Sequence, residues 1–130
     1  MKYLLDTNFL IGVIRKKINF IEKYKEISFD KQKISAITVT EIYAGCREHE
    51  INATREFIKR LSIIPVNEYI AKEAGSLIYS FARKGITLHT PNAIIGATAK
   101  LYHLTLLTQN TKDFPTLYPS QIEKFPNSKT

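Results

Sequence analysis

Long apolar runs, export signals and cysteine pairs are all missing from this sequence. No apolar stretch approaches the roughly 18–20 residues of a membrane-spanning helix, and the N-terminus lacks the charged-then-apolar pattern of a signal peptide. Cys46 is the only cysteine, so no disulfide can form within the chain, as is typical of proteins in a reducing cytosol. We therefore expect a cytoplasmic protein with no membrane segment.

Glycine-rich phosphate motifs and internal repeats are missing too. Neither G-x-x-x-x-G-K-[ST] nor G-x-G-x-x-G occurs, so no nucleotide cradle is expected. The three histidines, His49, His89 and His103, show no metal-ligand spacing and are interpreted as surface or helix-end residues. No linker divides the chain. The sequence therefore predicts one domain over residues 1–130, with a loose tail at 126–130.

Acidic residues are outnumbered. Nineteen Lys and Arg against 12 Asp and Glu give a net charge of +7 and a pI of about 9.5. This balance favours a polyanionic or acidic partner, but it does not choose among nucleic acid, a membrane surface and an acidic protein. The clusters Lys16-Lys17, Lys23-Lys25 and Arg55-Lys59-Arg60 are either solvated helix faces or an RNA-contacting surface.

Short apolar segments alternate with stretches of helical periodicity. Strands are expected at residues 3–5, 34–37, 63–66, 104–108 and 122–125, with the 63–66 strand at an edge because of Pro65. Helices are expected at 9–16, 18–26, from Thr38 or Thr40 toward Cys46, at 50–61, from an Asn67 cap to about Lys84, and from Pro91 through Ala99. This alternation indicates an α/β fold, with a parallel sheet covered by helices on both faces.

Four polar residues fall where a strand gives way to a helix or a turn: Asp6, Glu41, Asn92 and Asp113. Asp6 follows the buried run Tyr3-Leu4-Leu5, and the carboxyl ends of strands are where open α/β sheets bind ligands. Carboxylates that converge at one sheet edge repel one another unless a cation lies between them, and Mg²⁺ prefers oxygen ligands. Such a site, with phosphate as a further ligand, predicts a metal-assisted phosphodiesterase.

Each of these residues also has a local structural explanation. Asp6 can cap the helix that follows it. Thr38-Val39-Thr40-Glu41 has the pattern of a capping box, and Asp113 lies in a turn-forming sequence. Asn92 can be a polar residue at a helix end. Spacing alone does not show that the four residues meet, so both interpretations stay open.

Four stretches carry a stronger signal because they occur together in order. They are LDTNFLI at 5–11, ITVTEIYAG at 37–45, PNAIIGATA at 91–99 and LTQNTKDF at 107–114. In these stretches the chain resembles the PIN-domain ribonucleases, specifically the VapC-like toxins of bacterial and archaeal toxin–antitoxin pairs. The resemblance implies an α/β/α sandwich on a mostly parallel sheet of about five strands.

The resemblance also implies an activity, a cofactor and partners. It implies an endoribonuclease that depends on Mg²⁺, with Mn²⁺ as a substitute, and that cleaves structured RNA, foremost transfer RNA. It implies a homodimer or a higher toxin–antitoxin assembly, and a cognate antitoxin whose C-terminal segment covers the acidic pocket. The residues implied are the acids Asp6, Glu41 and Asp113, supported through hydrogen bonds by Thr7, Asn8 and Asn110.

Asn92 departs from the family pattern, because members usually carry Asp at this place. An amide keeps the shape and one acceptor oxygen but loses the charge. The chain is therefore an inactivated form, a natural member that works with three carboxylates, or a relic; Asn92 filling a ligand place suggests an inactivated or weakened enzyme. The alternative is a catalytically silent module that binds antitoxin or RNA without cutting. A third hypothesis, a nuclease of ribosomal RNA processing or DNA repair, is disfavoured by the small size.

Overall fold

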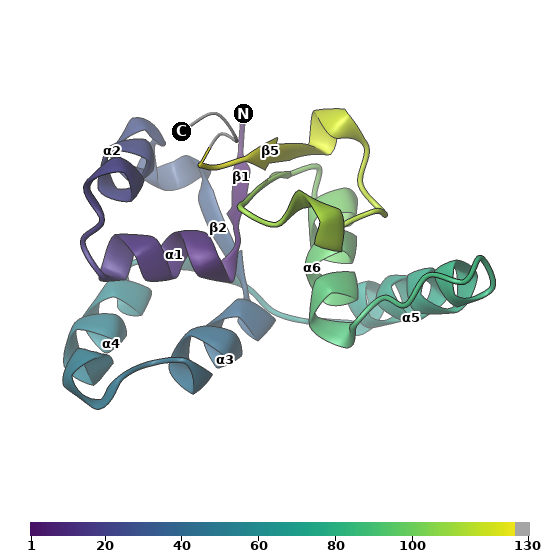
Figure 1. Cartoon of the computed structure of the whole chain (residues 1–130), viewed down its shortest axis with the longest axis horizontal. Helices are drawn as coiled ribbons and strands as arrows, with labels where there is room; N and C mark the ends of the chain where they lie inside the picture. Colours follow the sequence, from purple (N-terminus) through teal and green to yellow (C-terminus); the bar gives the residue numbers. More distant parts are fainter. Residues whose placement is uncertain (127–130) are drawn as a thin grey trace.

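A five-stranded parallel sheet forms the centre of the protein in the computed structural model, which describes residues 1–126 (Figure 1). Its strand order is β3-β2-β1-β4-β5, and every neighbouring pair is parallel. The predicted strands are thus all present, with β1 in the centre and β3 at an edge. Their bounds are β1 (Tyr3–Leu5), β2 (Gln32–Ser35), β3 (Ser62–Ile64), β4 (Thr105–Thr108) and β5 (Ile122–Lys124).

Helices cover both faces of this sheet. One face packs mainly against α1, α2 and α4, and the other packs against α5 and α6 (Figure 1). Helix α3 lies between the two groups, because it contacts both α1 and α6. The bounds are α1 (Thr7–Ile14), α2 (Ile18–Glu26), α3 (Ala36–Ala44), α4 (Ile51–Lys59), α5 (Glu68–Ala82) and α6 (Thr90–Leu101), with short 3₁₀ turns η1 (Phe29–Lys31), η2 (Glu48–Glu50), η3 (Thr111–Asp113) and η4 (Pro119–Gln121).

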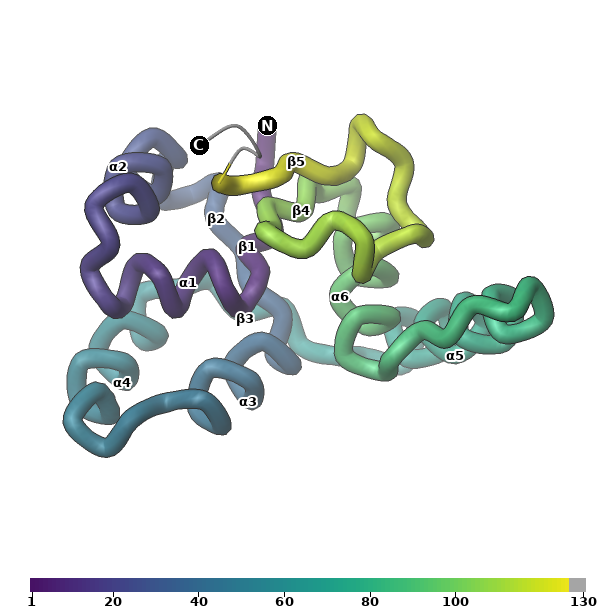
Figure 2. Tube along the Cα trace, in the orientation of Figure 1, coloured from purple at the N-terminus to yellow at the C-terminus, as the bar shows by residue number. Residues whose placement is uncertain are grey.

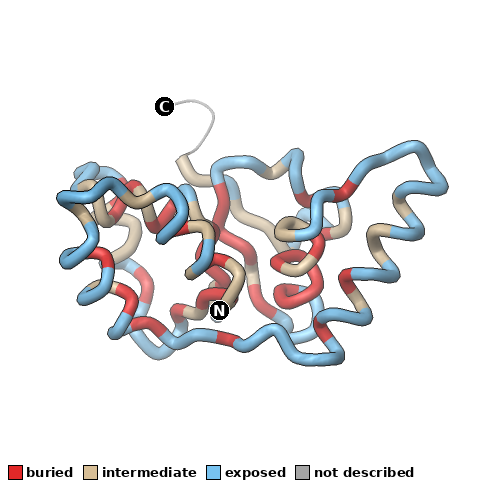
Figure 3. Tube along the Cα trace, turned by 90° about the horizontal axis from the view of Figure 1, so that it is seen from below, coloured by how far each residue is buried: buried red, intermediate tan, exposed pale blue. Residues whose placement is uncertain are grey.

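The central strands are buried on both sides. Leu4 and Leu106 face the core under α5 and α6, whereas Leu5 and Leu107 face the core under α1, α2 and α4. All four are fully buried, and the buried segments run through the middle of the molecule in Figure 3. Because successive side chains of a strand point to opposite faces, an uninterrupted apolar run suits a sheet sandwiched between helices. The predicted three-layer α/β/α architecture is confirmed.

The chain reverses its course across the sheet between β1 and β4. It passes from β1 to β2 to β3 in one direction, and then α5 and α6 return it to the other side of β1, where β4 and β5 follow. In open α/β sheets this switch point leaves a crevice at the carboxyl ends of the strands, and ligands bind there. The switch point therefore marks the ends of β1 and β4 as the place to look for a site.

Two helix starts differ from the prediction. The second strand ends at Ser35 rather than at residue 37, and the Ser35 hydroxyl accepts a 3.2 Å hydrogen bond from the Ile37 amide as the N-cap of α3. Thr38 is buried inside α3, and its hydroxyl has no hydrogen-bond partner among residues 1–126. The predicted capping box of Thr38 with Glu41 is therefore wrong. Helix α6 begins at Thr90, so Pro91 is its second residue.

Other local predictions are confirmed. The side chain of Asn67 accepts a 2.9 Å hydrogen bond from the Ile70 amide and caps α5. Gly85 has a φ of +80°, a conformation that favours glycine after a helix. The predicted tail lies outside the described residues from 127 onward. In the described part of the chain, no helix combines the length and apolar character needed to cross a membrane.

Candidate active site

Asp6 lies at the carboxyl end of β1 and is buried, with 7% of its surface exposed. Its amide donates a 3.0 Å hydrogen bond to the Leu107 carbonyl, which continues the pairing of β1 with β4 by one residue. Its Oδ1 accepts a 2.8 Å bond from the Thr7 amide, so Asp6 is also the N-cap of α1. The predicted capping role is therefore real, and it fixes the carboxyl group at the switch point.

Thr108, the last residue of β4, holds the other oxygen of Asp6. Its hydroxyl donates a 2.6 Å hydrogen bond to Asp6 Oδ2 and accepts a 3.1 Å bond from the Asn110 amide. The Asn110 amide thus occupies a lone pair of the hydroxyl and leaves its proton for Asp6. Sequence reasoning missed Thr108, although the register that sets Leu5 beside Leu107 also sets Asp6 beside Thr108.

Glu41 comes from α3 and reaches the same region through Thr7. The Thr7 hydroxyl donates a 2.6 Å hydrogen bond to Glu41 Oε1, while the Thr7 amide donates to Asp6. One residue therefore links the two acids, with its backbone on one and its side chain on the other. Thr7 is thus in hydrogen-bond contact with both acids.

Asp113 lies on the exposed 3₁₀ turn η3, just beyond β4. Burial raises the pKa of the Asp6 carboxyl above its ordinary value of 3.8, and hydrogen bonds from Thr108 and Thr7 oppose this rise. The negative charges of Glu41 and Asp113 raise the pKa of Asp6 further. Asp6 thus lies within electrostatic range of both Glu41 and Asp113.

The remaining predicted residues are less closely tied to Asp6. Asn92 is half-buried in the first turn of α6, a helix that packs against α3, and its side chain forms no hydrogen bond with residues 1–126. Asn8 is exposed and likewise has no side-chain hydrogen bond in that part of the chain. Asn110 contributes its backbone amide rather than its side chain.

The donor set suits a hard divalent cation in its chemistry, because it consists of carboxylate and amide oxygens. Each oxygen of Asp6 uses one hydrogen bond, so lone pairs remain on the carboxylate. Within residues 1–126, however, no three His, Cys, Asp or Glu side chains lie close enough to hold one metal ion together. The structure thus links Asp6 to Glu41 through Thr7, but it does not gather all the acids as one compact ligand set.

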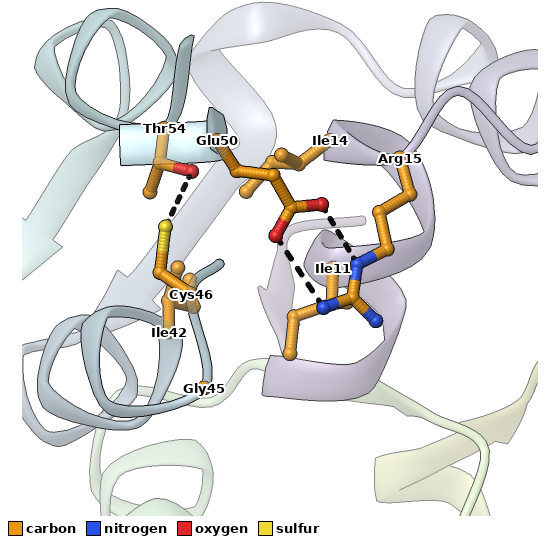
Figure 4. Close-up of a pocket in the computed structure, with 8 residues that line it drawn as sticks. All are labelled: Ile11, Ile14, Arg15, Ile42, Gly45, Cys46, Glu50 and Thr54. Carbon is orange, nitrogen blue, oxygen red and sulfur yellow. Dashed lines mark hydrogen bonds and ion pairs between the residues drawn. The ribbon is translucent and has the colours of Figure 1, made fainter. Parts of the chain in front are cut away.

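An ion pair at the far end of α1 fixes the segment that follows α3 (Figure 4). Arg15 Nε and Nη2 donate to the Glu50 carboxylate at 2.9 and 3.4 Å, and the Arg47 amide donates to Glu50 Oε1 at 2.9 Å. These bonds lower the pKa of Glu50 to about 2. Helix α1 is therefore tied at its start to α3, through Thr7, and at its end to the turn after α3, which holds Glu41 in place relative to Asp6.

Comparison with known proteins agrees with this fold. The sequence pattern of the PIN domain matches residues 3–118, so the chain belongs to the PIN domain family. The chain is 28% identical to ribonuclease VapC2 of Haemophilus influenzae. The alignment spans 120 residues and covers 88% of this chain and 90% of that protein. It is 27% identical to a tRNA(fMet)-specific endonuclease VapC of Salmonella typhimurium, over 95% of this chain and 97% of the relative.

Solved structures of toxin–antitoxin complexes contain chains with a similar fold. A toxin–antitoxin complex from Klebsiella pneumoniae contains a chain with a TM-score of 0.79 and 31% identity, covering 95% of this chain and 97% of that chain. DNA-bound VapBC from Salmonella typhimurium gives a TM-score of 0.81 with 26% identity, over 95% and 98% of the two chains. Within the PIN family, the protein is therefore VapC-like.

Proposed function

We propose that this protein is a metal-dependent endoribonuclease toxin that cleaves structured RNA, foremost transfer RNA, and thereby inhibits translation. The observation that carries the proposal is the acid pair Asp6 and Glu41, joined by Thr7 at the switch point, with the negative charge of Asp113 acting on Asp6. Relatives named as a ribonuclease and as a tRNA(fMet)-specific endonuclease support the reaction and the substrate class.

Each residue of the site has a proposed role. Asp6, Glu41 and Asp113 would hold Mg²⁺ or Mn²⁺, with the Asn92 amide oxygen filling a further ligand place. When bound, the cation would supply activation of water and stabilisation of charge on the phosphate oxygens. Thr108 and the Thr7 amide hold the Asp6 carboxylate in one orientation, and the Thr7 hydroxyl does the same for Glu41.

The partners follow from charge and from the relatives. A net charge of +7 favours binding to a polyanion such as RNA. Toxin–antitoxin complexes among the similar structures support a cognate antitoxin as the inhibitor, and we propose that the protein acts in the cytoplasm as a homodimer or within a larger toxin–antitoxin assembly.

Cleavage of unfractionated transfer RNA by this chain and by its Asn92→Asp variant tests the proposal. Each protein is incubated with Mg²⁺, with Mn²⁺ and with chelator, and Asp6→Asn in the Asn92→Asp background serves as the matched control. We expect the Asn92→Asp form to cut, chelator to stop it, and the Asp6→Asn control to leave the RNA intact. No cleavage of transfer RNA by Asn92→Asp, or full activity after Asp6→Asn, would overturn the proposal.

Asn92 favours one alternative function. A neutral amide binds a hard cation more weakly than a carboxylate and cannot act as a base. The protein would then be a catalytically silent PIN module that binds antitoxin or RNA without cutting. Metal-dependent cleavage by the chain with Asn92 in place would exclude this alternative.

A further inference from the structure

A hollow of about 310 Å³ lies beside the candidate active site, at the carboxyl ends of β4 and β5. Figure 2 shows the segment after β4 running next to β5, and η3 contacts that strand. This volume is at the lower end of the range of about 300–1,000 Å³ for ligand pockets. It can hold one small group, such as a single residue or nucleotide, rather than a helix or a duplex. The lining residues are Gln109, Asn110, Thr111, Lys112, Asp113 and Lys124.

The hollow shares residues with the acidic site. Asp113, a proposed ligand of the cation, forms part of its wall. Lys124 pairs in register with Thr108, the residue that holds Asp6, so the two backbones lie roughly 4.8 Å apart on neighbouring strands. A polymer lying across the acids would therefore pass beside the hollow at Asp113.

The two lysines of the hollow have no acidic partner. Lys112 and Lys124 form neither an ion pair nor a side-chain hydrogen bond with residues 1–126. Several other lysines are paired with glutamates, namely Lys23, Lys59, Lys72 and Lys100. Unpaired ammonium groups in a concave site attract anions, because a partly enclosed surface focuses their field.

We propose that this hollow, which we call the lysine hollow, binds one nucleotide of the RNA strand next to the phosphate that is cut. Lys112 and Lys124 bind its backbone phosphate, and the amides of Gln109 and Asn110 offer donors and acceptors to the base or the 2′-hydroxyl. This inference rests on the proposed function, since it takes RNA as the polyanion. The lysine hollow then positions the strand and contributes to the choice of cutting place.

Salt-dependent binding tests the lysine hollow without any cleavage. Fluorescence anisotropy with end-labelled unfractionated transfer RNA, in chelator, gives Kd over a series of salt concentrations. Loss of a phosphate contact should flatten the slope of log K against log[salt] by about 0.7 to 0.9. We expect this change for Lys112→Gln and for Lys124→Gln, together with a higher Kd at each salt concentration.

Lys25→Gln is the matched control. Lys25 is exposed in the last turn of α2, has no ion pair with residues 1–126, and does not line the hollow. Lys25→Gln removes the same unit of charge as the other two substitutions, and its slope of log K against log[salt] should equal that of the parent. Equal flattening by all three variants would mean a general basic surface and would overturn the inference, as would unchanged slopes for both lysines of the hollow.

Cleavage kinetics separate this inference from the proposed function. In the Asn92→Asp background, loss of a contact made equally in the bound and the transition state raises KM and leaves kcat unchanged. If Asn92→Asp cuts normally but the lysine variants change neither KM nor the salt slope, the lysine hollow is wrong and the nuclease stands. If no form cuts but the slopes flatten only for Lys112 and Lys124, the lysine hollow stands as an RNA-binding site and the proposed reaction is wrong.

Discussion

The hydroxyl of Thr108 donates a 2.6 Å hydrogen bond to Oδ2 of Asp6, joining residues that are 102 positions apart in the chain. The bond is buried and crosses from the end of β4 to the end of β1. It offsets part of the cost of burying a carboxylate, because hydrogen bonds to an ionised group favour its charged form. Together with the bond from the Thr7 amide, this contact sets the orientation of the central acid.

Replacing Thr108 with Val should destabilise the protein. The change keeps a branched side chain but removes the donor to Asp6 and the acceptor for the Asn110 amide. A hydrogen bond to a charged group contributes about 1.5–3 kcal/mol, so the free energy of unfolding at neutral pH should fall by about that amount. Urea denaturation measures the change.

Thr105→Val on the same strand is the control for this prediction. The Thr105 side chain forms no hydrogen bond within residues 1–126 and is half-buried, so its replacement should change stability by less than about 0.5 kcal/mol. Thr108→Ser, which restores the hydroxyl, should recover most of the loss. If Thr108→Val lowers the free energy of unfolding by no more than Thr105→Val does, the hydrogen bond to Asp6 contributes little to stability.

Asp6→Asn should stabilise the protein at neutral pH. Because the folded-state pKa of Asp6 is raised above 3.8, ionisation weakens the folded state as pH rises from 3.8 through the raised pKa. Asn keeps an acceptor for the Thr7 amide and is an equally good N-cap. Its NH2 group cannot accept the bond that the Thr108 hydroxyl donates to Asp6, but it can donate to that hydroxyl instead, and Asn carries no charge beside Glu41 and Asp113. Tm should therefore exceed that of the parent at pH 7, and this advantage should disappear below pH 3.8.

Thermal unfolding of the parent and of Asp6→Asn, from pH 7 to below pH 3.8, shows whether the substitution raises or lowers Tm. A parent that is as stable as Asp6→Asn at pH 7 would show that the two hydrogen bonds fully offset burial and repulsion. Loss of cleavage together with a gain in stability is the expected pattern where a strained acid serves activity rather than folding.

The Arg15–Glu50 pair should give the protein part of its pH dependence in acid. The pKa of Glu50 is about 2, below its ordinary 4.5, so its contribution to stability is present above pH 4.5 and is lost as pH falls toward 2. Arg15→Gln removes the cause of the shift and should flatten the stability profile between these values. Denaturant unfolding at a series of pH values measures the slope.

Glu50→Gln offers a second test of the same pair. It removes the titrating group but keeps an oxygen for the Arg47 amide, so it should flatten the profile as Arg15→Gln does. Profiles for the parent and both variants that run parallel between pH 4.5 and 2 would contradict this assignment.

Two glycines should respond in opposite ways to replacement by alanine. A Cβ on Gly12 would lie 2.7 Å from Cγ of Phe20, inside the packed contact of α1 with α2, and such overpacking costs about 1–3 kcal/mol. A Cβ on Gly75, inside α5, would meet no atom within 4 Å. Gly75→Ala should therefore stabilise the protein by about 0.5–1 kcal/mol through helix propensity.

Chemical denaturation of the two alanine variants measures both changes side by side. Unaltered stability for Gly12→Ala would show that the Phe20 ring moves aside at no cost. A loss for Gly75→Ala would show that this face of α5 is covered by another chain, such as a second copy of the protein.

Local sequence patterns predicted helices and strands correctly where the burial of the segment and the chemistry of its end residues indicate the same element. The apolar runs of β1 and β4 are continuous because both faces of these strands are buried, and Asn67 and Gly85 mark the limits of a helix through their own side-chain and backbone chemistry. The end of β2 was misplaced because apolar residues continue past Ser35 into α3. The Ser35 hydroxyl, which caps α3, marks the start of that helix better than the hydrophobic pattern does.

The site was predictable only in part. Asp6 stands between β1 and α1 as predicted, whereas Glu41 lies inside α3 rather than at its start, and the structure links the two through Thr7. Thr108 escaped notice because its role depends on which strand pairs with β1, and that pairing is decided by the whole chain. The lysine hollow likewise joins residue 112 to residue 124 through the β4–β5 register, which no local spacing reveals.

The position of β1 at the centre of the sheet has a consequence for biosynthesis. One of its two neighbours, β4, spans Thr105–Thr108 in a chain of 130 residues. While the ribosome is still making the polypeptide, the aspartate at residue 6 is exposed early but has neither Thr108 nor the Leu107 carbonyl to hold it. An arrested or truncated nascent chain that ends before β4 therefore cannot hold the residue-6 carboxylate in the orientation that the folded protein gives it.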